Sequence, residues 1–126
     1  MLDFGLAIAV AIAGGIGSVI RLFLGSWRGR LPWGIMVANS LAGLILAVLQ
    51  LVSLRLDGVP AQHFVFSVVF LGLCGGLSTY SSVAADTGNY LRERSYGRAA
   101  ANLAVNLGFP LVAYIVPVML LINLVN

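Results

Sequence analysis

Charge is scarce in this sequence. Only 9% of its 126 residues are Asp, Glu, Lys or Arg, whereas a soluble domain carries roughly 25%. Lysine is absent altogether, and 60% of the residues are hydrophobic. A water-facing globule of this composition would precipitate, so the sequence predicts a membrane protein, and the mean hydropathy of +1.03 agrees with this prediction.

Residues that support hydrolysis or metal chemistry are equally scarce. Cys74 is the single cysteine, which excludes an internal disulfide framework and a multi-cysteine metal site. One histidine, His63, and four acidic residues complete the set of common metal ligands and acid-base groups. We therefore expect that the protein is not an enzyme. The seven arginines are better explained as topology markers than as a surface for nucleic acid.

Long apolar runs are what the sequence does contain. A hydrocarbon core of ~30 Å requires about 20 mostly apolar residues per helix, and four runs qualify: 4–24, 33–54, 64–86 and 99–124. The expected fold is a single all-α domain over 1–126 with four transmembrane helices. Its connections at 25–32, 55–63 and 87–98 are too short for a further domain. Pro110 and Pro117 fall inside the fourth run and predict kinks.

The arginines predict one orientation in the membrane. In a four-span chain, the first and third connections share one side, and the second connection shares the other side with both termini. The first side holds Arg28, Arg30, Arg92, Arg94 and Arg98, with Arg21 at its membrane edge, against Arg55 alone on the other. By the positive-inside rule, both termini lie outside the cytoplasm.

The third run carries the strongest polar signal. Residues 72–82 read GLCGGLSTYSS, in which two adjacent glycines precede four hydroxyl residues around Tyr80. These residues are poor material for a continuous helix, so we expect a break near Gly75 to Ser78. Peptide groups exposed by a break at membrane depth need a cavity, an ion or another subunit. A merely kinked packing helix is the simpler alternative.

Three further polar positions interrupt the apolar runs. Asn39 precedes Gly43 by four residues on one helical face, Asn102 and Asn106 share a face of the fourth run, and Arg21 follows a glycine-rich segment. The asparagines either line a polar path or form interhelical hydrogen bonds. Arg21 either has a functional role or snorkels to the interface.

Taken in order, these clusters resemble the Fluc (CrcB-type) family of fluoride channels. The matching residues are Gly14, Gly15, Gly17 and Arg21 in the first run, Trp33, Gly34, Asn39 and Gly43 in the second, and Gly75 to Ser82 in the third. The resemblance covers nearly the whole chain. It implies a passive channel in the bacterial inner membrane that exports fluoride, built as an antiparallel dimer with two pores along the interface.

The resemblance also implies the roles of particular residues. A central sodium ion would be held by backbone carbonyls at Gly75 and Ser78 of both subunits. Arg21 would belong to the vestibule. The expected pore and anion positions are Asn39, Tyr80, Ser81, Ser82, Val83 and, on the fourth run, Asn106. Hydroxyl and amide donors can replace the hydration of a small anion, and aromatic rings present their positive edges to it.

Two departures suggest an unusual dimer. The family usually has phenylalanine at both aromatic positions of the third helix, whereas this chain has Tyr80 and Val83. The arginine bias is also unfavourable for inserting one sequence in both orientations. We therefore expect a homologous partner in the opposite orientation, giving a heterodimer with unequal pores, although a homodimer is the other possibility.

Two alternative functions compete with this prediction. A small multidrug or guanidinium exporter also has four spans, but it relies on a glutamate in the first helix, and residues 4–24 contain no acid. A non-conducting accessory subunit of a fluoride channel is the second alternative, for which Val83 is the main argument. The exporter would couple substrate transport to proton movement, whereas the accessory subunit would conduct no ions.

Overall fold

The computed structural model describes residues 3–55, 58 and 61–125. Within them lie four helical spans long and apolar enough to cross a membrane, at Phe4–Gly25, Trp33–Arg55, Gln62–Arg92 and Tyr96–Leu124. This result confirms the predicted all-α, four-span architecture. The outermost ends of the predicted domain (1–2 and 126) and part of its second connection (56–57 and 59–60) lie outside the described residues.

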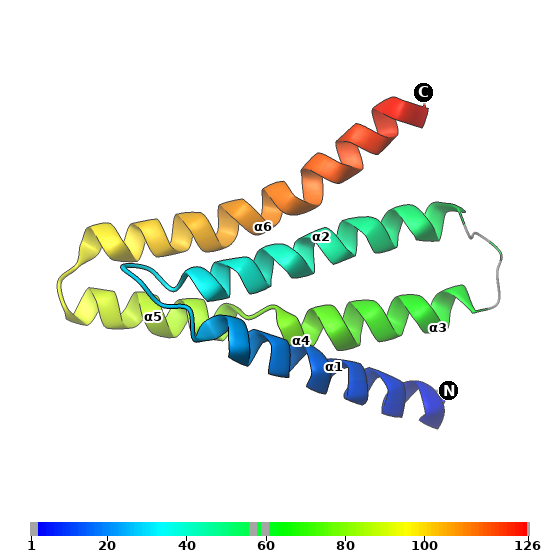
Figure 1. The fold of residues 1–126 in the computed structure, drawn as a ribbon, viewed down its shortest axis with the longest axis horizontal. Coiled ribbons are helices and arrows are strands. Elements are labelled where there is room, and N and C mark those ends of the chain that lie inside the picture. Colours follow the sequence, from blue (N-terminus) through cyan, green and yellow to red (C-terminus); the bar gives the residue numbers. More distant parts are fainter. Residues whose placement is uncertain (1–2, 56–57, 59–60, 126) are drawn as a thin grey trace.

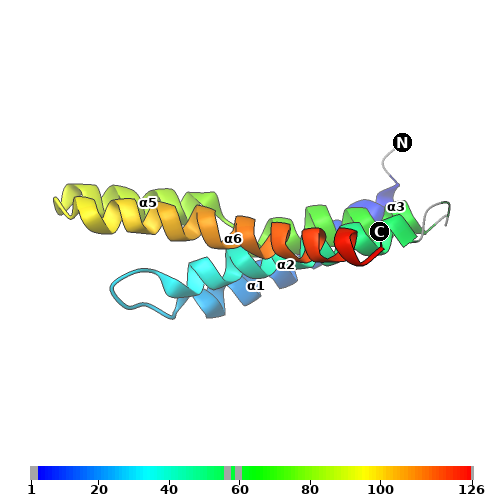
Figure 2. The same cartoon turned by 90° about the horizontal axis from the view of Figure 1, so that it is seen from above.

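The spans alternate in direction along the bundle. Helix α1 (Phe4–Gly25) and helix α2 (Trp33–Arg55) are joined at one end, and the third and fourth spans are joined at that same end (Figure 1). The marked N and C ends of the chain lie at the opposite end. Seen from above, the third and fourth spans form one layer near their connection, and α1 and α2 form another (Figure 2).

The third span is broken, as the sequence predicted. It consists of α3 (Gln62–Ser67), the wide π-helical segment η1 (Val68–Cys74), the short α4 (Gly75–Leu77) and α5 (Tyr80–Arg92). The backbone is extended at Ser78 (ψ 150°) and at Thr79 (φ −153°, ψ 124°). Gly75 and Gly76 remain helical, so the break lies at the C-terminal edge of the predicted segment.

Close backbone contacts between α1 and the third span leave no room for side chains at some of the glycines. A Cβ atom on Gly76 would collide with the carbonyl of Gly14, and a Cβ atom on Gly17 would lie 2.8 Å from the amide nitrogen of Leu77. Lipid gives helices no hydrophobic reason to associate, so close backbone approach of this kind supplies the packing instead. Helix α1 therefore packs directly against both η1 and α4.

The fourth span, α6 (Tyr96–Val125), stays helical through Pro110 and Pro117. Its C-terminal part turns away from the bundle (Figure 1). A Cβ atom on Gly43 of α2 would lie 2.6 Å from the Pro110 carbonyl, so the glycine lets the two helices meet where the proline interrupts the helix.

The third connection is shorter than predicted. Helix α5 continues to Arg92 and α6 begins at Tyr96, so only 93–95 join them, rather than 87–98. Thr87, expected in the connection, is buried and belongs to the helix. A polar residue at this position reads as a loop in the sequence, but here it is buried against a polar residue of the neighbouring helix.

Candidate functional site at the broken third span

Asn39 of α2 holds the break in place. The Thr79 N–H donates to Asn39 Oδ1 at 2.7 Å, and Asn39 Nδ2 donates to the Thr79 carbonyl at 3.3 Å. Both residues are only 8% exposed. One side-chain amide thus satisfies both peptide groups of the extended residue, which water or a helical neighbour would otherwise have to satisfy.

Thr79 in turn begins α5. Its Oγ1 accepts a hydrogen bond from the Ser82 N–H at 3.2 Å, which is the geometry of a helix N-cap. The same oxygen lies 3.0 Å from Ser81 Oγ and 3.2 Å from Ser82 Oγ. Three hydroxyl groups therefore gather at the positive end of a helix, an arrangement that favours an anion.

A chain of amide groups leads away from Asn39. Its Nδ2 donates to Asn106 Oδ1 at 3.4 Å, and Asn106 Nδ2 donates to Asn102 Oδ1 at 2.9 Å. Asn102 Nδ2 then donates to Thr87 Oγ1 at 2.9 Å and to the Val83 carbonyl at 3.2 Å. Both fourth-span asparagines are buried. The chain joins α2, α5 and α6 through directed hydrogen bonds.

An open groove lies where these helices meet the break. Its volume is about 240 Å³, and it brings together four of the predicted pore residues with three others: Asn39, Tyr80, Val83 and Asn106, with Ser78, Thr79 and Pro110. Tyr80 is 66% exposed and Val83 only 1%. The tyrosine therefore projects from the single chain, while the valine forms the wall.

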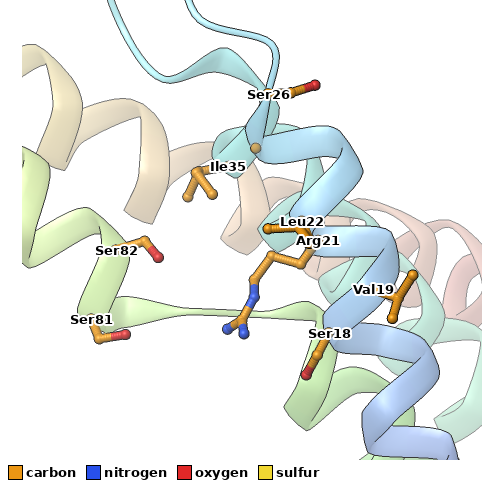
Figure 3. Close-up of a pocket in the computed structure, with 9 residues that line it drawn as sticks. Ser18, Val19, Arg21, Leu22, Ser26, Ile35, Ser81 and Ser82 are labelled. Atoms are coloured by element: carbon orange, nitrogen blue, oxygen red, sulfur yellow. The ribbon is translucent and has the colours of Figure 1, made fainter.

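A second cavity, of about 640 Å³, is lined by three further predicted residues, Arg21, Ser81 and Ser82. Arg21 extends from α1 towards the extended segment before α5, and Ser81 and Ser82 face it across the cavity (Figure 3). Ser18, one turn before Arg21, lines it as well and donates to the Gly76 carbonyl at 3.4 Å. We call this space the Arg21 cavity. It joins a guanidinium to hydroxyl groups, all of them donors to an anion.

Gly75 and Ser78, the positions implied for sodium, are both exposed on the single chain. The Thr79 N–H, which would continue the helix onto the Gly75 carbonyl, is taken by Asn39. Among the described residues, no three His, Cys, Asp or Glu side chains gather to hold a metal. Backbone carbonyls at a helix break are established ligands for sodium, so these residues fit the ion.

The sequence did not reveal three polar residues that the structure pairs with distant parts of the chain. The sequence pattern predicts Thr79 only as part of a hydroxyl run, places Thr87 in a connection and ends a span at Asp86. Asp86 pairs with Arg28, the Nη2 atom lying 2.9 and 3.2 Å from the two carboxylate oxygens. The signal that could have found Asp86 is its charge, since it is the single acid within the third run.

Comparison with known proteins gives a consistent result. A family model described as "CrcB-like protein, Camphor Resistance (CrcB)" matches residues 8–118. The fluoride-specific ion channel FluC of Thermococcus gammatolerans is 36% identical over 106 residues, which cover 81% of this chain and 84% of the relative. The FluC of Paraburkholderia xenovorans is 34% identical over 109 residues, covering 83% and 85% of the two chains. FluC 1 of Rubrobacter xylanophilus is 32% identical over 113 residues, covering 86% of each.

Proposed function

This chain belongs to the CrcB-like family, and from that premise we propose that it is a subunit of a passive fluoride-specific ion channel. The relatives are named ion channels, in agreement with the expectation that the chain is not an enzyme. The observation that carries the proposal is the break at Ser78 and Thr79, where hydroxyl and amide groups meet a groove open to the subunit surface.

Fluoride is small and strongly hydrated, so its path must offer replacement donors. Ser81 and Ser82 supply hydroxyls at the start of α5, and Arg21 supplies a positive charge in the cavity beside them. The ring of Tyr80 adds its positive edge at the groove. Several weak sites in sequence let the ion enter and also leave.

Asn39 is the amide donor most easily turned towards an anion. Its Nδ2 makes two long contacts, of 3.3 and 3.4 Å, whereas Asn102 and Asn106 each make a contact of 2.9 Å. Longer bonds are weaker. Asn39 Nδ2 can therefore donate to a passing fluoride at little cost, while Asn102 and Asn106 keep the path in shape.

A second subunit in the opposite orientation would complete the path. Tyr80, Gly75 and Ser78 are exposed on the single chain, as an interface of two copies around the break requires. Val83 leaves the groove without a second ring, so the proposed partner is a homologue that supplies one. A sodium ion bound by the Gly75 and Ser78 carbonyls of both subunits would offset the repulsion between their helix ends.

The proposed location is the bacterial inner membrane, with both termini outside the cytoplasm. The α1–α2 connection and the α5–α6 turn lie at one end of the bundle and carry Arg28, Arg30 and Arg94 (Figure 1). A tag at the C-terminus should report one orientation. A mixed signal would remove the charge argument for a heterodimer.

Fluoride efflux from liposomes tests the function. We expect weak or absent efflux from this chain alone and fast efflux when a homologue from the same organism is co-purified, with chloride retained in both cases. Equal efflux from the two preparations would contradict an obligate partner. No efflux from either would contradict the channel and favour the accessory subunit that Val83 suggests.

The exporter alternative has less support. The described part of α1 contains no acid, and Asp3 immediately before it serves as the N-cap, accepting from the Gly5 N–H at 3.2 Å. A proton-coupled exporter needs an acid at membrane depth to exchange protons for substrate. Guanidinium-driven proton movement in the same liposomes would revive this alternative.

A further inference from the structure

An ion pair joins the α1–α2 connection to α5. Arg28 Nη2 lies 2.9 Å from Asp86 Oδ1, and the Asp86 side chain is only 11% exposed, against 62% for Arg28. The hydroxyl of Tyr90, one turn further along α5, donates to the Arg30 carbonyl at 3.4 Å. The connection is therefore fastened to α5 at two points, and the carboxylate is the more deeply placed partner of the ion pair.

The pair lies beside the Arg21 cavity. Asp86 follows Ser82 by four residues on α5, so the two side chains share one face with Cβ atoms about 5–6 Å apart. Ser82 lines the cavity, and so does Ser26, two residues before Arg28. The ion pair thus links the segment that follows Ser26 to the helix that carries Ser82, and neither of its two residues lines the cavity itself.

We propose that Arg28 neutralises the Asp86 carboxylate and thereby keeps the Arg21 cavity passable for an anion. The inference rests on the proposed function, because it concerns how fluoride reaches Ser81 and Ser82. An unpaired carboxylate one turn from Ser82 would repel an anion that enters the cavity. Arg28 is a positioning residue in this role, because it acts through Asp86.

The proposal predicts that substitutions of Arg28 and of Asp86 change the fluoride efflux rate differently. Fluoride efflux is measured at one fixed pH, using whichever preparation conducts faster, the chain alone or the chain with its homologue. Arg28→Gln should slow efflux about tenfold, while Asp86→Asn should keep the wild-type rate or exceed it. The double variant should match Asp86→Asn, and Arg28→Lys should keep most of the rate.

A purely structural ion pair predicts a different pattern. Both single variants would then lose efflux alike, and equal losses would overturn the proposal. A double variant as slow as Arg28→Gln would overturn it too, because Arg28 would then act on the anion directly. Size-exclusion profiles in detergent establish that each variant is folded, and should Arg28→Gln fail to fold, the rates of Arg28→Lys and Asp86→Asn decide.

The proposed function and this inference fail in distinguishable ways. Wild-type liposomes that leak fluoride no faster than protein-free ones contradict the channel and, with it, the role of the pair. Wild-type liposomes that conduct, with Asp86→Asn slower than wild type, contradict the role of the pair alone.

Discussion

The two halves of the third span are held by different forces. Before the break, η1 and α4 lie against α1 with backbone touching backbone, because Gly14, Gly17 and Gly76 have no side chains. After the break, α5 is joined to α2 and α6 by amide and hydroxyl groups. The first half is held by close backbone packing, whereas the second is held by hydrogen bonds between side chains and peptide groups.

The glycine-packed half should be the more sensitive to a single added methyl group. In Gly76→Ala, the new Cβ meets the Gly14 backbone, which cannot move aside as a side chain could, so we expect a loss of about 3 kcal/mol in the free energy of unfolding. Gly15→Ala is the matched control, since a Cβ there meets nothing within 4 Å. Denaturation by SDS in mixed micelles measures both. Equal losses would show that the close approach is not what holds this half.

In the hydrogen-bonded half, two substitutions of Asn39 should affect stability and fluoride conduction to different degrees. Asn39→Ala leaves both peptide groups of Thr79 unpaired and should cost about 2–3 kcal/mol of unfolding free energy. Asn39→Asp keeps an acceptor for the Thr79 N–H and should cost less. Its fixed negative charge should nevertheless abolish fluoride efflux. If Asn39→Asp conducts, Asn39 serves the fold alone, and the two halves of the third span differ in packing but not in their contribution to conduction.

Features that depend on local sequence could be predicted, whereas features that depend on contacts between distant residues could not. The break could be predicted because adjacent glycines and a run of hydroxyls disfavour a helix locally. The extension of the break to Thr79 could not be predicted, since it depends on Asn39, which binds the Thr79 peptide groups from 40 residues away. Of the predicted pore residues, Asn39, Tyr80, Val83 and Asn106 line one groove. Their roles in conduction remain predictions.

Pairing across the chain was the part that local patterns could not reveal. Arg28 and Asp86 are 58 residues apart, and neither has a neighbour that marks the pair. The Thr87 hydroxyl donates to the Val83 carbonyl at 2.7 Å and accepts from Asn102, so a residue predicted in a connection proves to be buried between helices. Polar residues near the end of a span are ambiguous until their partners are known.

An aromatic ring introduced at Val83 tests whether the groove needs a second ring. Val83→Phe places an aromatic edge in the groove, so efflux from the chain alone should rise several-fold. Val83 is 1% exposed, and the larger side chain should cost about 1–2 kcal/mol of unfolding free energy. Val83→Leu adds bulk without a ring and should lower stability without raising efflux. Faster efflux in Val83→Leu would mean that volume matters and the ring does not.

The smallest effect should come from a polar contact far from the break. The Tyr114 hydroxyl donates to Gln50 Oε1 and joins α6 to α2. Interhelical hydrogen bonds in membranes contribute about 0.6 kcal/mol on average, so Tyr114→Phe should lower the free energy of unfolding by that amount and leave efflux unchanged. Tyr96→Phe, on an exposed residue at the start of α6, is the control. A large loss of efflux in Tyr114→Phe would contradict this expectation. It would mean that residues of α6 beyond Pro110 also contribute to conduction.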